Sequence, residues 1–170
     1  IAGFLRTLLA GVPWSESADA EDAIQLEAPS RGRLRIHNAN GRTRVRGEER
    51  ADIAVRASKR ARAESRGAAE ELLRQLRVVS RSEGGALSLQ VDAPRRWNRR
   101  GHVHLEVLVP RGLSVEVTAV NGRIEIEGIR GEVRARSSNG SARICDVIGD
   151  VEVATSNAKV FCACICGRLR

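Results

Sequence analysis

The sequence predicts an all-β fold, a β-solenoid made of stacked β-strand repeats of about 18 residues, with one helix inserted near residues 65–77. Three observations lead to this prediction. Asn-Gly or Asn-Ala pairs recur at positions 121, 139 and 157, and glycine recurs at positions 131, 149 and 167. Apolar and polar residues alternate on both sides of each pair, which is the period of a half-buried strand. Aromatic residues make up only 2% of the chain.

Each repeat is expected to contain two short strands separated by an Asn-Gly corner. Valine occupies positions 115, 133 and 151, and the apolar residues Ile126, Ile144 and Cys162 form a second column with the same spacing. A single unit cannot bury such a face, whereas units stacked about 4.8 Å apart make a continuous core. At the corners, stacked Asn side chains are placed to form a hydrogen-bonded ladder. The expected corner residues are Asn121, Asn139, Asn157, Gly122 and Gly140.

The amino-acid composition fits a core made of thin, similar layers of small and aliphatic side chains. Hydrophobic residues make up 42% of the chain, and the low aromatic content excludes the usual Trp- or Tyr-built platform for a ligand or carbohydrate. The formal net charge of +8 comes almost entirely from arginine, because Lys59 and Lys159 are the only lysines. Such a charge makes nucleic acid, an anionic polymer or a membrane surface a candidate partner.

A period of 18 residues also fits left-handed hexapeptide β-helices, many of which are acyltransferases. That fold requires an aliphatic residue at every sixth position. Six positions after Val117 the sequence has Arg123, and six positions after Ile126 it has Glu132. The hexapeptide interpretation therefore fails.

The first half of the chain carries the same pattern. Aligning Asn40-Gly41 on the corner at 121–122 places Leu34 on Val115, Ile36 on Val117 and Val45 on Ile126. We therefore expect residues 30–170 to form a single β-repeat domain, regular from residue 113 and continuing beyond residue 170. Ser65 is the expected N-cap of the inserted helix, and residues 83–85 are expected to turn a hairpin.

Residues 1–29 are expected to form an amphipathic N-terminal segment and a linker. The apolar run at residues 1–12 is interrupted by Arg6 and is too short for a transmembrane segment. Residues 16–29 are polar and acidic, with a strand expected around residues 23–26. The four cysteines are clustered near the C-terminus, which favours a reducing compartment and therefore the cytoplasm, with the cell surface as the alternative.

Three motifs resemble a known family. They are the segment Leu34-Arg-Ile-His-Asn-Ala-Asn-Gly41, the junction Val109-Pro-Arg-Gly112, and the tandem units at 120–122 and 137–140. Over roughly residues 30–170 the chain resembles the putative adhesin domain family of bacterial β-strand-repeat proteins. The resemblance implies a β-solenoid or stacked-sheet fold and no established catalytic residues.

Two groups of residues have types that bind metals. A zinc site could be built from Cys145, Cys162, Cys164 and Cys166. The repeat spacing favours a structural role, because Cys162 takes the core position of Ile126 and Ile144, where a thiol packs as a small apolar group. His102 and His104, with Glu106, lie on the outward face of one expected strand, where polar residues also occur without any function. No metal and no cofactor is expected.

The basic loop at residues 95–100 is the candidate anion-binding site. It contains Arg95, Arg96, Trp97, Arg99 and Arg100. Guanidinium groups pair with phosphates and an indole ring stacks on bases, although a solvated hairpin loop is the simpler interpretation.

Signatures of a P-loop, a dinucleotide site, a nucleophile elbow or a zinc protease are missing from the sequence. The sequence therefore predicts a non-catalytic scaffold or interaction domain. Its expected partner is an unknown protein or a second copy of the chain, bound through the open end of the solenoid. Binding of nucleic acid or another anionic polymer through residues 95–100 is the alternative.

Overall fold

The computed structural model describes residues 16–30, 32–94 and 101–170, and the expected amphipathic segment at residues 1–12 and the basic loop at 95–100 lie outside these ranges. The described chain is almost entirely β-structure, so the all-β prediction is confirmed. Its elements are β1 (Glu16–Glu27), β2 (Arg33–Asn40), β3 (Thr43–Glu48), β4 (Asp52–Ala63), α2 (Arg66–Gln75), β5 (Arg77–Glu83), β6 (Ala86–Asp92), β7 (Gly101–Pro110), β8 (Ser114–Asn121), β9 (Ile124–Ile129), β10 (Val133–Ser137), β11 (Ala142–Ile148), β12 (Val151–Thr155) and β13 (Val160–Cys166).

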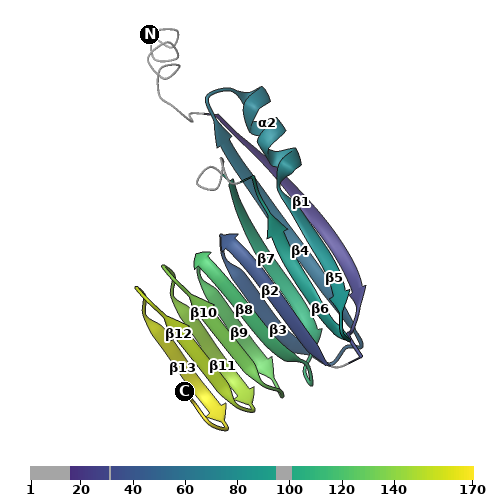
Figure 1. Ribbon diagram of the computed structural model, residues 1–170, viewed down its shortest axis with the longest axis vertical. Helices are drawn as coiled ribbons and strands as arrows, with labels where there is room; N and C mark the ends of the chain where they lie inside the picture. The colour runs from purple at the N-terminus through teal and green to yellow at the C-terminus, as the bar shows by residue number, and fades with distance from the viewer. Residues whose placement is uncertain (1–15, 31, 95–100) are drawn as a thin grey trace.

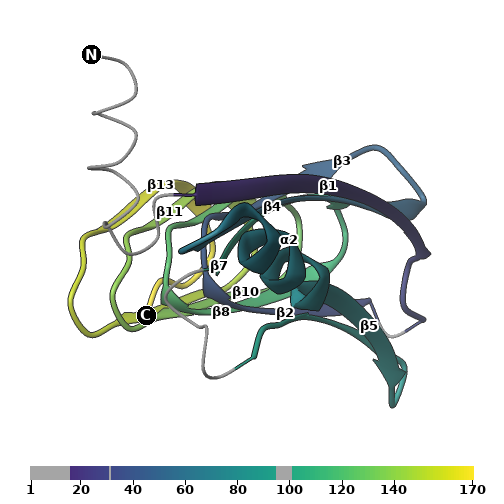
Figure 2. The same cartoon turned by 90° about the horizontal axis from the view of Figure 1, so that it is seen from above.

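The strands form two mixed sheets that face each other as layers (Figure 2). One sheet has seven strands in the order β1-β4-β7-β3-β9-β11-β13, and the other has six in the order β12-β10-β8-β2-β6-β5. Helix α2 lies at the end of the molecule opposite to β13 (Figure 1), where it packs against β1 and β4. Ser65 caps the helix by accepting a hydrogen bond from the amide of Ala68, as the sequence predicts.

The C-terminal half consists of parallel strands that pair with an offset of 18 residues. In one sheet Val115, Val133 and Val151 lie side by side on β8, β10 and β12. In the other, Ile126 of β9 lies beside Ile144 of β11, which lies beside Cys162 of β13. Because successive strands alternate between the two sheets, each unit adds one strand to each layer.

Strands β2 and β3 continue these stacks, as the alignment of the first half on the repeats predicts. Leu34 pairs with Val115, and Ile36 pairs with Val117. Val45 of β3 pairs with Ile126 of β9 in the same way. Parallel pairing extends to β7 beside β3 and to β6 beside β2. The outer strands are antiparallel: β4 pairs with β1 and β7, and β5 forms a hairpin with β6.

The strand expected around residues 23–26 is present, but it begins earlier than expected: residues 16–22, expected as a linker, also belong to the edge strand β1, which pairs along its whole length with β4. The acidic residues concealed this part of the strand in the sequence. Asp19 reaches across to Arg60 and Asp22 reaches to Lys59, so these carboxylates are cross-strand partners. Every second side chain from Ala18 to Leu26, with Asp22 among them, is partly buried.

One continuous hydrophobic core is buried between the sheets and beneath α2, and its apolar side chains are aliphatic, while the polar residues Asn38 and Thr43 are also fully buried. Its largest fully buried side chains are Leu34, Ile36, Ile53, Leu76, Leu89, Leu105, Ile124, Ile126, Ile129 and Ile144, with Val45 and Val103. These residues can fill thin layers spaced by the separation of adjacent strands. No helix within the described ranges has the length and hydropathy of a membrane span.

Glycine at the corners allows the repeats to stack closely. A Cβ atom on Gly122 would lie 2.0 Å from the carbonyl oxygen of Gly41, and one on Gly140 would lie 1.9 Å from that of Gly122. Both distances are far inside van der Waals contact, and the obstructing atoms belong to the backbone. The Asn-Gly pairs therefore combine a side chain that can bond along the stack with a residue that permits close approach.

Candidate functional site

The corner asparagines form a row of side-chain hydrogen bonds along the stack. Nδ2 of Asn157 donates to Oδ1 of Asn139 at 3.1 Å, and Nδ2 of Asn139 donates to Oδ1 of Asn121 at 3.1 Å. Nδ2 of Asn121 in turn donates to Oδ1 of Asn40 at 3.0 Å, so the row also includes the first half of the chain. Every bond runs in the same direction, which leaves an acceptor at the C-terminal end of the row.

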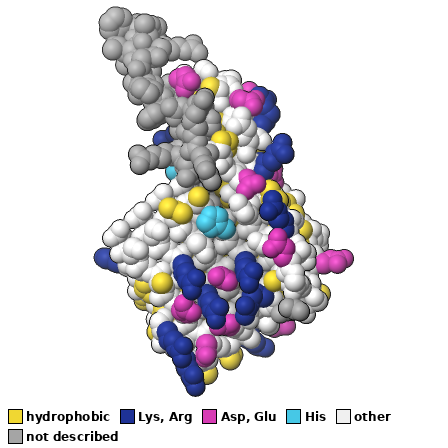
Figure 3. Space-filling view, viewed as in Figure 1, with side chains coloured by type: hydrophobic (Ala, Val, Ile, Leu, Met, Phe, Trp, Pro, Cys, Tyr) yellow, Lys and Arg dark blue, Asp and Glu magenta, His cyan; other side chains and the backbone are white. Residues whose placement is uncertain are grey.

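The outward face of the six-stranded sheet carries a row of alternating charge. Arg35, Glu116, Arg134 and Glu152 occupy the same register position on β2, β8, β10 and β12. Ion pairs join Arg35 Nε to Glu116 Oε2 at 3.5 Å and Arg134 Nε to Glu152 Oε2 at 3.4 Å. Figure 3 shows basic and acidic side chains interleaved on the lower part of one face. This pairing accounts for part of the arginine content without requiring a second molecule that binds the arginines.

The seven-stranded sheet carries an equivalent network on its outward face. Arg46 Nε lies 2.5 Å from Glu127 Oε1, and Arg44 Nη2 lies 3.3 Å from the same oxygen. The hydrogen bond from Arg46 lowers the pKa of the Glu127 carboxyl below its ordinary value, and the positive charges of both arginines act in the same direction. Both networks are partly exposed, so each pair contributes little to stability.

Both rows of ion-paired side chains end at the C-terminal end of the stack. Strand β13 is the edge of its sheet, and it has no charged residue between Val160 and Cys166. The Phe161 side chain is 52% exposed, and its ring lies 5.0 Å below the guanidinium carbon of Arg143. Of the large apolar side chains exposed in the described chain, all but Val120 lie at this end: Ile148, Val160, Phe161 and Leu169.

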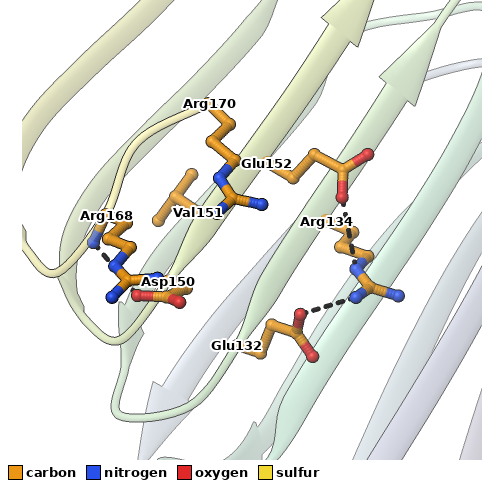
Figure 4. Close-up of a pocket in the computed structure, with 7 residues that line it drawn as sticks. All are labelled: Glu132, Arg134, Asp150, Val151, Glu152, Arg168 and Arg170. Atoms are coloured by element: carbon orange, nitrogen blue, oxygen red, sulfur yellow. Dashed lines mark hydrogen bonds and ion pairs between the residues drawn. The ribbon is translucent and has the colours of Figure 1, made fainter.

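The adjoining edge of the other sheet is polar. Figure 4 shows Arg134 between Glu132 and Glu152, and Arg168 beside Asp150. The backbone amide of Arg168 donates to Oδ1 of Asp150 at 3.1 Å. These residues surround a cavity of about 70 Å³, which has room for only a few water molecules. This polar cavity is therefore far smaller than a typical ligand pocket.

The four cysteines lie on or beside this end, and all four are free thiols. Cys162 faces inward beside Ile144, and its partial burial raises the pKa of the thiol. Cys145 pairs with Ala163, and Cys166 pairs with Ile148. Across residues 16–30, 32–94 and 101–170, no three His, Cys, Asp or Glu side chains are placed to hold a metal ion.

A left-handed backbone position recurs in the stack beside these cysteines. Gly128, Asp146 and Cys164 occupy equivalent sites and have φ values of 72°, 53° and 54°. This conformation is free for glycine and tolerated by aspartate, but it costs about 1–2 kcal/mol for a residue such as cysteine. Cys164 is thus held in a conformation that its side chain disfavours.

His102 and His104 lie on the outward face of β7, as the alternation predicts. Their neighbours on β4 are Arg60 and Ser58, respectively. Burial lowers the pKa of His104, and the nearby positive charges of Arg42, His102 and Arg60 lower it further. The sequence did not associate these histidines with Arg60, because β4 and β7 are outside the 18-residue repeat.

Comparison with solved structures identifies a protein of similar fold. A putative cell adhesion protein from Clostridium sporogenes superposes with a TM-score of 0.56 over 86% of this chain and 73% of its own, at 11% sequence identity. The chain shares its fold with that protein. The resemblance predicted from the sequence is therefore confirmed at the level of the fold.

Two further structures have lower scores. A putative lipid binding protein from Parabacteroides distasonis gives a TM-score of 0.46 at 10% identity, over 89% of this chain and 73% of its own. A putative adhesin from Bacteroides fragilis gives 0.34 at 9% identity, over 89% of this chain and 96% of its own. No protein-family model matches the chain. No curated protein matches its sequence.

Proposed function

We propose that this chain is a non-catalytic interaction module, a β-solenoid whose C-terminal end binds the same end of a second copy. The observation that carries the proposal is the uncharged edge strand β13, with Val160 and Phe161 exposed. Edge strands offer unpaired backbone N–H and C=O groups, and soluble proteins usually protect them with charged side chains or proline. An edge without such protection favours pairing with another strand.

The regular stacking supports the solenoid part of the proposal. Successive strands alternate between the two sheets and equivalent strands are offset by a constant 18 residues, so that the chain completes one coil in each unit. In this proposal β1 to β13 belong to one domain, because side chains from both sheets and from α2 meet in one core. The domain then begins at β1 rather than at residue 30.

The charged side chains support a role without catalysis. Most outward-facing Arg and Glu residues of the repeats contact each other, as in the pairs Arg35–Glu116 and Arg134–Glu152. Their positions follow from the stacking of unlike charges on adjacent strands. No catalytic task is needed to account for them.

The proposal includes a location at the cell surface or outside the cell. The protein from Clostridium sporogenes that shares the fold is named as a putative cell adhesion protein. The clustered cysteines alone favour the cytoplasm, but the repeat explains Cys162 as a core residue at a position held by isoleucine in the preceding units. The proposal therefore prefers the surface.

Amide hydrogen exchange of β13 at low and high protein concentration tests this function. The outward-pointing amides of β13 have no partner in an isolated chain, whereas an added strand would hydrogen-bond them. We expect their exchange to slow as the concentration rises, while the amides of β1, at the opposite edge of the same sheet, keep a constant rate. Exchange at β13 that does not depend on concentration would contradict the proposal.

A further inference from the structure

A hollow on the outward face of the seven-stranded sheet is separate from the C-terminal end. It has a volume of about 410 Å³ and lies over β1, β4 and β7. The alternation of β4 and β7 directs Ser58, Arg60 and Arg62 to the same side of the sheet as His102 and His104. The residues that line the hollow are Asp19, Ser58, Lys59, Arg60, Arg62, His102 and His104.

The hollow is rich in hydrogen-bond donors that are only partly used. Arg60 uses Nε to bind Oδ1 of Asp19 at 2.6 Å, which leaves the two terminal nitrogens of its guanidinium. Arg62 forms no ion pair with any described residue. Lys59 does not add to this supply, because Nζ lies 2.8 Å from Asp22 and donates to the carbonyl of Leu76 at 3.2 Å.

The histidine geometry adds a neutral donor. Nδ1 of His104 accepts a hydrogen bond from the backbone amide of Arg42 at 2.9 Å. The proton of the neutral ring must then be on Nε2, which is a donor. Burial and the neighbouring positive charges lower the pKa of His104, which agrees with this neutral state. His102 lies directly beside Arg60 in the register of β7 and β4.

We propose that Arg60, Arg62, His102 and His104 form a binding site for a sulfate or phosphate group. Guanidinium groups bind the planar and tetrahedral oxyanions through paired N–H donors, and neutral imidazole adds a donor without requiring low pH. Asp19 opposes binding by charge, but it also orients Arg60 and leaves that guanidinium with free donors. The site is independent of the C-terminal end, so its failure would leave the proposed self-association untouched.

Proton NMR of the histidine rings tests the site, because the chain has three histidines and one of them is an internal control. His37 lies on β2, in the other sheet. We expect sodium sulfate to shift the ring resonances of His102 and His104 in a saturable manner and to leave His37 unchanged, compared with sodium chloride of equal ionic strength. Equal shifts at all three rings, or no shift, would overturn the proposal.

Variants separate a specific site from general charge. Arg62→Gln should weaken sulfate binding about fivefold, whereas Arg35→Gln, a matched change beside His37, should have no effect on it. Asp19→Asn should strengthen binding, because it removes the carboxylate found among the described residues that line the hollow. A sulfated polysaccharide that binds more tightly than inorganic sulfate would identify a polymer as the source of the group, and equal affinity would identify the free ion. Unchanged binding by Arg62→Gln and Asp19→Asn would refute the site.

Discussion

The side-chain amide of Asn157 lies 3.1 Å from Oδ1 of Asn139 and donates to it, in the last bond of a row that runs the length of the repeats. Oδ1 of Asn157 accepts no hydrogen bond from the described residues. The row therefore has a direction, and its open acceptor lies at the same end of the stack as the uncharged edge strand β13. The same end thus presents an unused side-chain acceptor and unpaired backbone groups.

The row predicts unequal losses of stability along the stack. Asn139→Ala removes one bond to Asn121 and one from Asn157, whereas Asn157→Ala removes a single bond. At about 0.5–1.5 kcal/mol for each bond, we expect Asn139→Ala to lower the free energy of unfolding by about twice as much as Asn157→Ala. Urea unfolding of the two variants measures this ratio. Equal losses would show that the amides do not act as a row.

Close stacking at the corners predicts a large effect from one methyl group. Gly140→Ala places Cβ against the carbonyl of Gly122, and relief requires a shift of the backbone, so we expect a loss of about 1–3 kcal/mol. Gly67→Ala is the matched control, because a Cβ there contacts nothing and α2 gains about 0.5–1 kcal/mol. Thermal unfolding should lower the Tm of the first variant and raise that of the second. A neutral Gly140→Ala would contradict the close approach.

The left-handed position of Cys164 predicts a stabilising substitution. Cys164→Gly relieves the strain of a φ of 54° and should raise the free energy of unfolding by about 1 kcal/mol. Cys166→Gly, two residues further along the same strand, has no such strain to relieve and should lower it by about 0.5–1 kcal/mol. Denaturant unfolding under reducing conditions compares the two variants. Effects of the same sign would argue against the strain.

The Glu127 network predicts a loss of stability in acid. The pKa of this carboxyl is lowered on folding from its ordinary value of 4.5, so its contribution is complete above that pH and disappears as the pH falls through the folded value. Glu127→Gln should therefore destabilise the protein near neutral pH by at most about 1 kcal/mol, and by less near about pH 3. Glu83→Gln, at the exposed β5–β6 turn, provides the control. A deficit that stays constant with pH would refute this contribution.

Most of the repeat region could be predicted from the sequence because its period is fixed. Once the corners at Asn121 and Asn139 are aligned, the pairing of Val115 with Val133 and of Ile126 with Ile144 follows from equal spacing. The charged row through Glu116 follows for the same reason. An alternating sequence and a constant offset are sufficient to place these residues.

Features that depend on non-repeating contacts could not be predicted in this way. The carboxylates of Asp19 and Asp22 made the first part of β1 look like a linker, and only pairing with β4 reveals their partners. Arg60 meets His102 because β4 runs antiparallel to β7, a relationship with no sequence period. The exposure of Phe161 follows from the place of β13 at the edge of a sheet, which the repeat pattern does not encode.

Sedimentation velocity tests the central claim most directly. We expect the chain to associate as its concentration rises from about 1 to about 100 µM, and Phe161→Lys to abolish this association by placing a charge on the edge of β13. Val120→Lys, at another exposed apolar residue, should associate normally. A strictly monomeric chain over the whole range, or association that Phe161→Lys leaves intact, would contradict the proposed role of the C-terminal end.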